Sequence, residues 1–193
     1  MVKKISALLV LLICFYTVTQ EVVSKADLSP KEDFKSAPKT VMLKTDKVLI
    51  SKPPSYDYNN VTNPSNATES YLLGILEGYP VQLCSQAFIQ AEKEYGVNAL
   101  VLVGIVCLES DYCRSYRAET TNNLWGAAVY GDSSSGCYFD SWNDSILSLA
   151  RTLKLEYITK EGRINLDTIA EKFCVTPGWG NTVSKVIDSL LTR

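Results

Sequence analysis

The chain has 193 residues, of which 46% are apolar and 21% charged, so it suits a globular domain and is too apolar for wholesale disorder. It contains no histidine, which excludes Ser-His-Asp and Cys-His nucleophilic catalysis and His-ligated zinc or haem. With 19 basic and 21 acidic residues, it also lacks the cationic field of a nucleic-acid-binding protein. Any chemistry must use carboxylates, hydroxyls or thiols, and we expect no metal or other cofactor.

The first segment is typical of an export signal. Two lysines precede an apolar run from Ile5 to Val18, which has the length of a signal-peptide core and is shorter than the roughly 20 residues of a membrane-spanning helix. Small residues fit cleavage after Ala26, whereas an uncleaved segment would attach the protein to the membrane. We therefore predict a signal peptide or anchor over residues 1–26 and a secreted or cell-surface protein.

Residues 27–70 have the composition of a flexible tether. Five of the seven prolines fall in this segment, together with many Ser, Thr, Asn and Lys residues and no glycine. Such a segment cannot bury enough apolar surface to offset the entropy lost on ordering. We predict a low-order tether here, followed by one folded domain over residues 71–193.

From Tyr71 onward the spacing of apolar residues becomes helical. An amphipathic helix is predicted to begin near Pro80 and to end at Gly96. Asn98 can then cap a second helix over residues 99–108, which is apolar on nearly every side, as expected of a helix buried in the middle of a small domain.

The rest of the domain is predicted to contain more helices and one exception. Apolar stripes indicate three helices, within residues 142–157, 165–173 and 183–191. Residues 124–139 differ, because three glycines punctuate the pairs Val129-Tyr130 and Tyr138-Phe139, a pattern that favours a short β-hairpin. The expected fold is therefore mainly α with one short hairpin.

Five cysteines lie beyond the signal segment: Cys84, Cys107, Cys113, Cys137 and Cys174. They contain no CxxC pair, which argues against structural zinc, and an oxidising compartment favours disulfides. An odd count suggests two bridges and one free thiol. The sequence leaves the pairing open; we favour Cys113 with Cys137, beside the expected cleft, and place Cys107 in the core.

Glu109 directly follows the all-apolar helix. Burial disfavours a charged carboxylate there, and so does the negative end of the helix dipole. Both effects raise its pKa, and a glutamic acid that remains protonated near neutral pH can protonate the leaving oxygen of a glycoside. The alternative is a solvated glutamate at the point where the helix reaches the surface.

Several short sequence blocks around Glu109 have an order and spacing that resemble those of a known family. They are Gly96-Val97-Asn98-Ala99-Leu100, Glu109-Ser110, Asn122-Asn123-Leu124-Trp125-Gly126 with Tyr130, Phe139-Asp140-Ser141-Trp142, and Asp144-Ser145-Ile146. Together they are similar to the glucosaminidase family of bacterial cell-wall hydrolases, within the lysozyme-like superfamily. The resemblance covers roughly Tyr71 to Leu191, nearly all of the predicted domain.

The resemblance implies an activity. Proteins of this kind cleave the β-1,4 bond on the reducing side of N-acetylglucosamine in peptidoglycan, with the glutamate of the Glu-Ser block as general acid. This implies the role of general acid for Glu109. It also implies a lysozyme-like helical domain whose partner is a peptidoglycan strand.

The second catalytic group is less well defined by the sequence. Many members of the family place an acid or a tyrosine in the hairpin, where this chain offers Asp132 and Tyr138, or a tyrosine near the C-terminal motif, where Phe173 stands instead. Asp132 could orient a water, although its Gly-Asp-Ser-Ser-Ser context is also ordinary turn chemistry. The 2-acetamido group of the substrate is an alternative nucleophile.

Five residues are predicted to bind the glycan. The amides of Asn122 and Asn123 suit hydrogen bonds to a sugar, or else they stabilise a turn. Trp125 and Trp179 offer flat faces for pyranose rings, although tryptophan in a small domain is more often in the core. Tyr130 completes the set.

The leading expectation is a monomeric, exported peptidoglycan hydrolase. One alternative is a lytic transglycosylase of the same superfamily, which leaves an anhydro-muramyl end. Another is a non-catalytic module that holds glycan for an assembly, which the mild acidity of the chain would suit. Nucleic acid is not an expected partner.

Overall fold

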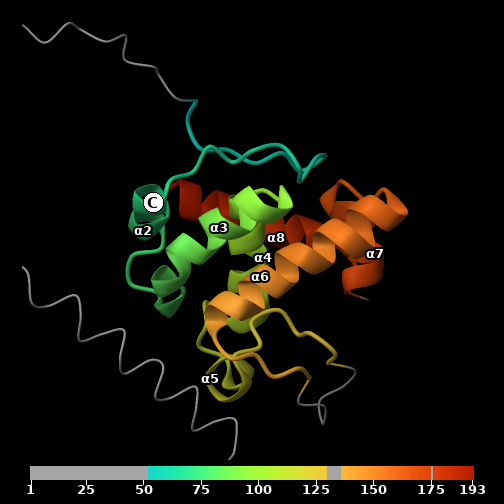
Figure 1. Cartoon of the computed structure of the whole chain (residues 1–193). Coiled ribbons are helices and arrows are strands. Elements are labelled where there is room, and N and C mark those ends of the chain that lie inside the picture. The colour runs from blue at the N-terminus through green and yellow to red at the C-terminus, as the bar shows by residue number, and fades with distance from the viewer. Residues whose placement is uncertain (1–51, 130–135, 175) are drawn as a thin grey trace, which may run out of the picture. The chain divides into compact units, whose positions relative to one another are not determined.

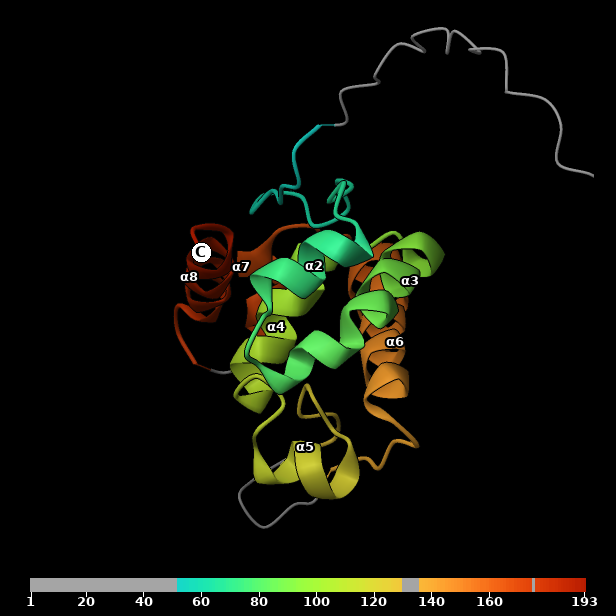
Figure 2. The ribbon, with the colours of Figure 1, turned by 90° about the vertical axis from the view of Figure 1, so that its left-hand side faces the viewer.

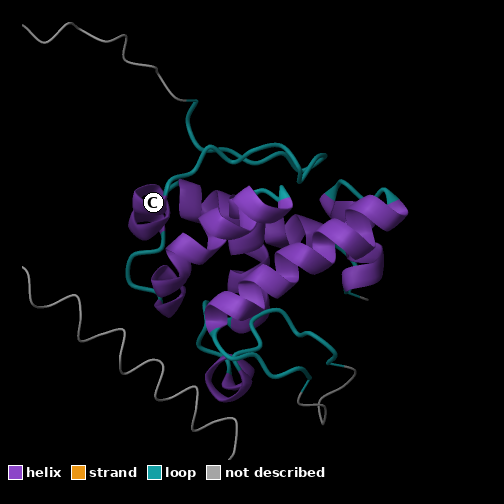
Figure 3. Cartoon of the chain, in the orientation of Figure 1, coloured by secondary structure: helices purple, strands orange, loops and turns teal. Residues whose placement is uncertain are grey.

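The computed structural model describes residues 52–129, 136–174 and 176–193, so the predicted signal segment and residues 27–51 lie outside the described residues. Within that part of the chain the regular elements are helices and no strand occurs (Figures 1 and 3). The predicted mainly α class is confirmed. The elements are α2 (Glu69–Ile75), the 3-10 helix η1 (Pro80–Cys84), α3 (Ser85–Tyr95), α4 (Ala99–Ser110), α5 (Tyr116–Thr121), α6 (Trp142–Thr152), the π-helix η2 (Leu153–Thr159), α7 (Leu166–Phe173) and α8 (Trp179–Leu191).

Helix α4 forms where the sequence predicts it, and the helix predicted from Pro80 to Gly96 is divided into the 3-10 helix η1 and α3. Gly96 ends α3 in the left-handed conformation, with φ 65°, and the backbone turns there. Asn98 caps α4, because its side-chain oxygen accepts hydrogen bonds from the backbone N–H groups of Leu100 and Val101 at 3.0 and 3.2 Å. Every residue over 99–107 is buried, which confirms the prediction of a central buried helix.

Helix α4 is the centre of the packing. It contacts α8, α3 and α6, and α3 also packs against α6 (Figure 2). Gly104 permits the close crossing of α4 and α8, because a Cβ atom at this position would lie 2.5 Å from Cγ1 of Ile187. The last turn of α4 therefore has a fixed position in the domain.

The three apolar stripes of the C-terminal half also form helices. The first continues from α6 directly into η2, and the other two form α7 and α8. Their buried residues, such as Ile146, Leu149, Ile169 and Ile187, join the same core as α4. None of the helices in the described ranges is long and apolar enough to cross a membrane.

Residues 52–68 differ from the tether predicted over 27–70. Val61 is fully buried, and its backbone donates to Ile164 O and accepts from Asn98 N, both at 2.8 Å. The Tyr58 hydroxyl donates to Asp167 at 2.5 Å, and Tyr56 bonds to Ser184 at 2.6 Å. Although this segment is rich in proline, these contacts hold it as an arm against the helices. We refer to residues 52–68 as the N-terminal arm.

The predicted hairpin over 124–139 does not appear as strands. The described parts, 124–129 and 136–139, are turns and loop, and residues 130–135 lie outside the described residues. A backbone hydrogen bond from Cys137 N to Ala127 O, at 2.8 Å, joins the two parts. Positive φ values at Gly126, Ala128 and Gly136 interrupt the extended conformation that a ladder of strand hydrogen bonds requires.

The five cysteines beyond the signal segment are free thiols, so the predicted Cys113–Cys137 bridge is absent. The reason is their location. Cys113 is 2% exposed and its side chain hydrogen-bonds to that of Cys84 in the core, whereas Cys137 is exposed. Cys107 is buried, as predicted.

Candidate active site

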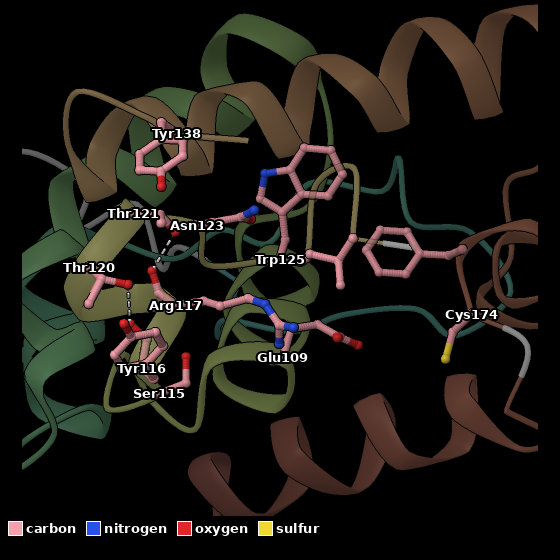
Figure 4. Close-up of a pocket in the computed structure, with 13 residues that line it drawn as sticks. Glu109, Ser115, Tyr116, Arg117, Thr120, Thr121, Asn123, Trp125, Tyr138 and Cys174 are labelled. Carbon is pink, nitrogen blue, oxygen red and sulfur yellow. Dashed lines mark hydrogen bonds between the residues drawn. The ribbon is translucent and has the colours of Figure 1, made fainter. Parts of the chain in front are cut away.

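A cleft of about 620 Å³ opens beside the C-terminal end of α4 (Figure 4). This volume lies within the range of small-molecule binding sites in proteins. The residues that line it come from α4, from α5 and its N-cap, from the loop that follows α5, and from the end of α7. They are Glu109, Ser115, Tyr116, Arg117, Thr120, Thr121, Asn123, Trp125, Gly126, Val129, Tyr138, Phe173 and Cys174.

Glu109 lies in the last turn of α4 and is half-buried. Its carboxyl oxygen Oε1 accepts a hydrogen bond from the indole N–H of Trp179 at 2.6 Å. Burial raises the pKa of Glu109, and the bond from Trp179 opposes this effect because it stabilises the charged form. Burial has the larger effect, so the group keeps its proton at a higher pH than an exposed glutamate does.

Trp179 is fixed by its own packing. It is the first residue of α8, is 4% exposed, and stacks on Phe173 with ring centroids 4.7 Å apart. The sequence analysis predicts it as a flat face for a sugar. In the structure Trp179 is not among the residues that line the cleft, and its indole N–H donates to the carboxyl group of Glu109.

The turn after Glu109 directs the chain to the opposite side of the cleft. Asp111, Tyr112 and Cys113 are all left-handed, with φ of 49°, 56° and 69°. Ser110 is fully buried and supports this turn: its hydroxyl donates to Val106 O at 2.6 Å and accepts from Cys113 N at 2.8 Å. The Glu-Ser pair thus combines an acid facing the cleft with a hydroxyl facing the backbone.

Helix α5 provides the opposite wall. Ser115 caps it by accepting from Ala118 N at 3.2 Å, and the indole N–H of Trp142 donates to Ala118 O at 2.8 Å, which ties α5 to α6. The exposed faces of Tyr116, Arg117 and Thr120 are thereby presented to the cleft. Among the described lining residues, Arg117 is the one cation and Glu109 the one carboxylate.

The two predicted asparagines bond to the backbone. Asn122 lies outside the set of lining residues, and its amide donates to Phe139 O at 2.9 Å. Asn123 lines the cleft but is 2% exposed, and its amide both donates to Ala127 O at 3.0 Å and accepts from Ala127 N at 2.9 Å. The sequence left open whether these amides bind sugar or stabilise a turn, and the contacts described here stabilise the turn.

Of the other residues predicted to bind glycan or to act in catalysis, the structure describes Trp125 and Tyr138. Trp125 lines the cleft, lies 6.2 Å from the ring of Phe173, and its indole N–H is buried without a hydrogen-bond partner. Tyr138 lines the cleft and is 72% exposed. Tyr130 and Asp132 lie outside the described residues, so their roles remain predictions, as does the catalytic role of Tyr138.

In the described part of the chain no group of three or more His, Cys, Asp or Glu side chains could hold a metal ion. Glu109, whose pKa is raised, can donate a proton into the cleft, and the wall along α5 is polar. Sequence reasoning missed Arg117 and the contact between Trp179 and Glu109. Arg117 follows the Ser115 cap by two residues, but nothing in that spacing indicates that its side chain faces the cleft.

Residues 85–192, which include the whole cleft, match the family model Glucosaminidase, described as mannosyl-glycoprotein endo-beta-N-acetylglucosaminidase. The match covers more than half of the chain. The chain belongs to the glucosaminidase family. This is a family of glycoside hydrolases, and the resemblance identified from the short sequence blocks is confirmed.

Two proteins of Streptococcus pneumoniae, from serotype 4 and from strain R6, are 32% identical to the chain over 106 residues. Each is provisionally named an endo-beta-N-acetylglucosaminidase. The aligned part is 52% of this chain but only 16% and 15% of those proteins. The chain therefore corresponds to a small part of each relative.

Solved structures of Autolysin E from S. aureus share the fold, with a TM-score of 0.62. A catalytic mutant in complex with the disaccharide NAG-NAM is 18% identical and aligns over 70% of this chain and 71% of that one. A complex with the muropeptide NAM-L-Ala-D-iGlu is 17% identical and aligns over 74% of both chains. The predicted lysozyme-like fold is confirmed.

Proposed function

We propose that the protein is an exported peptidoglycan hydrolase that cleaves the β-1,4 bond on the reducing side of N-acetylglucosamine, with Glu109 as general acid. The position of Glu109 carries the proposal. Its carboxyl group is half-buried yet lines an open cleft, and burial raises its pKa. A carboxyl group that keeps its proton, on the wall of a cleft large enough for sugars, meets the requirement for protonating a glycosidic oxygen.

In the proposed reaction Glu109 donates its proton to the bridging oxygen as the bond from that oxygen to C1 breaks. The electron pair of the bond passes to the oxygen, so the leaving sugar departs with a hydroxyl group. Water then adds to C1, and the proton that it loses restores Glu109. The Trp179 N–H, 2.6 Å from the carboxyl oxygen, stabilises the carboxylate that exists between these steps.

The group that stabilises positive charge at C1 is a separate question. Among the described cleft residues Glu109 is the one carboxylate. Asp132, Tyr138 and the substrate's own 2-acetamido group remain the candidates for this role. A single acid also suits a lytic transglycosylase, which breaks the bond on the reducing side of N-acetylmuramic acid because the C6 hydroxyl of that sugar attacks its own C1 in place of water. This is the second candidate function.

The proposal of export rests on the signal-like pattern over residues 1–26. The protein would then act on peptidoglycan outside the cytoplasmic membrane. Expression of the full chain in a bacterium, followed by fractionation, tests this part. Recovery of the protein in the cytoplasm alone would contradict it.

Product analysis tests the activity. Purified peptidoglycan is incubated with the wild type and with Glu109→Gln, and the fragments are identified by mass spectrometry. We expect fragments with N-acetylglucosamine at the reducing end, released about 10²- to 10⁴-fold more slowly by Glu109→Gln. Glu119→Gln is the matched control, because Glu119 is exposed on α5 and does not line the cleft; its rate should stay within about twofold.

The other functions give different results. Anhydro-muramyl ends would assign the protein to the lytic transglycosylases. Binding of the wild type to peptidoglycan with no fragment released would overturn the enzymatic proposal in favour of a glycan-binding module.

A further inference from the structure

Three buried cysteines lie near one another in the core, and the proposed reaction uses none of them. Cys84, Cys107 and Cys113 are each 1–2% exposed and belong to the same apolar cluster. The charge that Cys84 can carry raises the pKa of both other thiols, which places it close to each. Like every other such group in the described residues, the three could not hold a metal ion, so the chemistry open to them is oxidation.

Two of the three thiols are in direct contact. The side chains of Cys84 and Cys113 are hydrogen-bonded to each other, whereas Cys107 affects them through its charge alone. The Ser110 hydroxyl lies 3.8 Å from the sulfur of Cys113 and helps to fix its direction. Small movements of the two side chains would bring sulfurs in such contact to the S–S bonding distance of about 2 Å.

The segments that carry this pair touch at a second point. Cys84 ends η1, and Tyr79 immediately precedes η1. Cys113 follows Tyr112 in the turn after α4, and the rings of Tyr79 and Tyr112 are stacked with centroids 4.2 Å apart and an angle of 18° between their planes. Two contacts between the same two segments hold their backbones together, so the thiols meet each time the chain folds.

The turn that contains Cys113 needs such support. Its three residues 111–113 are all left-handed and none is glycine. Non-glycine residues keep this conformation only where the surrounding structure holds them in it. The turn begins two residues after Glu109, so a bond at its far end would also secure the end of α4 that carries the acid.

We propose that Cys84 and Cys113 form a disulfide when the protein folds in an oxidising compartment, that this bond fastens the turn after Glu109 to the end of η1, and that Cys107 stays a thiol. The inference rests on the proposed function only for export into such a compartment. In the structure all three are free thiols, which is the reduced form.

The oxidant is a small disulfide, and the exchange balances in two steps. The thiolate of one cysteine attacks a sulfur of the reagent, which forms a mixed disulfide and releases one reagent thiolate. The thiolate of the other cysteine then attacks the cysteine sulfur of the mixed disulfide and releases the second reagent thiolate. Two cysteine thiols are oxidised, one reagent disulfide is reduced, and both protons pass to the released thiols. Because both side chains are buried in the native state, the exchange takes place during folding.

The first experiment identifies the bond. The full chain, with the accessible Cys137 and Cys174 changed to serine, is unfolded in urea and refolded in parallel with oxidised glutathione and with dithiothreitol. Alkylation in denaturant should then add two fewer groups to the oxidised sample. Digestion with a glutamate-specific protease separates Cys107 from Cys113 by cutting after Glu109, and mass spectrometry without reduction should find peptide 78–92 linked to peptide 110–119.

The second experiment measures what the bond does. It closes a loop of about 30 residues, so the oxidised protein should melt about 10 °C higher than the reduced protein. This difference should vanish in Cys84→Ala and in Cys113→Ala. Cys107→Ala is the matched control, because it removes an equally buried thiol and should keep the difference. Each variant is compared with itself in the two redox states, so the cost of the lost side chain cancels.

Three results would overturn the proposal. They are equal numbers of alkyl groups in the two samples, a linked peptide that contains Cys107, and a melting difference that persists in Cys84→Ala or is lost in Cys107→Ala. Failure of the proposed function is a separate result, because it appears as absent cleavage of peptidoglycan while the thiol counts and melting temperatures still differ between the redox states.

Discussion

The two walls of the cleft are built on different principles. On the α4 side, Glu109 lies in the last turn of a helix that is buried over residues 99–107, and its position is fixed by apolar packing and by the Trp179 N–H. On the α5 side, the backbone is tied down by hydrogen bonds from Trp142, Thr121 and Asn123, while the tips of several side chains remain open to the cleft.

This difference suggests a division of labour between the walls. Low exposure to water raises the pKa of an acid, so the α4 wall suits the proton transfer. Polar side chains on a fixed backbone can bond to a ligand at little entropic cost, so the α5 wall suits recognition. Mutations on the two walls should therefore affect different measurements.

Trp179→Phe should have the largest effect on the reaction. Phenylalanine can keep the stacking on Phe173 but removes the N–H that bonds to Glu109. We expect kcat to fall about tenfold through loss of a hydrogen bond to a charged group. Since that bond lowers the pKa of Glu109, its loss raises the pKa. A general acid acts when protonated, so the alkaline limb of the pH–rate profile should move to higher pH.

Trp142→Phe is the counterpart on the α5 wall. It removes the N–H that bonds to Ala118 O and should lower the free energy of unfolding by about 1 kcal/mol. The alkaline limb should not move, because Trp142 does not contact Glu109. Equal shifts of the limb in the two variants would refute the division between the walls.

Asn123→Ala should destabilise the α5 wall by about 1–3 kcal/mol. The variant leaves the N–H of Ala127 without its partner and removes one of the two hydrogen bonds that the Ala127 carbonyl accepts, at a site that is 2% exposed. Urea unfolding measures the cost. Thr120→Ala, also on the cleft wall but exposed, should cost about 0.5 kcal/mol or less, and an equal cost for the two variants would contradict the structural role of Asn123.

Thiol alkylation should change the rate least, and it tests which cysteine side chains are accessible to solvent in and near the cleft. Cys174 lines the cleft and Cys137 is exposed, so both should react with iodoacetamide, whereas Cys84, Cys107 and Cys113 should not. Burial also raises the pKa of the Cys107 thiol, which leaves little reactive thiolate. Alkylation should slow the wild type severalfold and the Cys174→Ala variant much less; inhibition that is the same in both would show that Cys174 lies outside the path of the substrate.

The α4 wall was largely predictable from the sequence. A long apolar run, a capping Asn98 and an acid directly after the run are local patterns, and they predict both the helix and the partial burial of Glu109. The contact with Trp179 was not predictable, because it joins residues 70 positions apart and depends on how α4 and α8 cross at Gly104.

The α5 wall and the N-terminal arm illustrate what composition misses. Asn122 and Asn123 are equally suited to bind sugar or backbone, and only the positions of Phe139 and Ala127 decide between the two. The arm has the proline content of a tether. The burial of Val61 and the hydrogen bonds of the Tyr56 and Tyr58 hydroxyls nevertheless hold it against the helices. Local composition describes a tendency, whereas a few long-range contacts determine the outcome.

The N-terminal arm also sets the limits of the unit that folds on its own. Through Val61 and the two tyrosines it joins the start of α4, the segment before α7 and the side of α8. A recombinant fragment that starts at Tyr71 would lack those three attachments and would expose the apolar surface against which Val61 packs. Boundaries for crystallisation or for fusion to another protein should therefore be placed before Tyr56, and resistance to proteases should extend through residues 52–68.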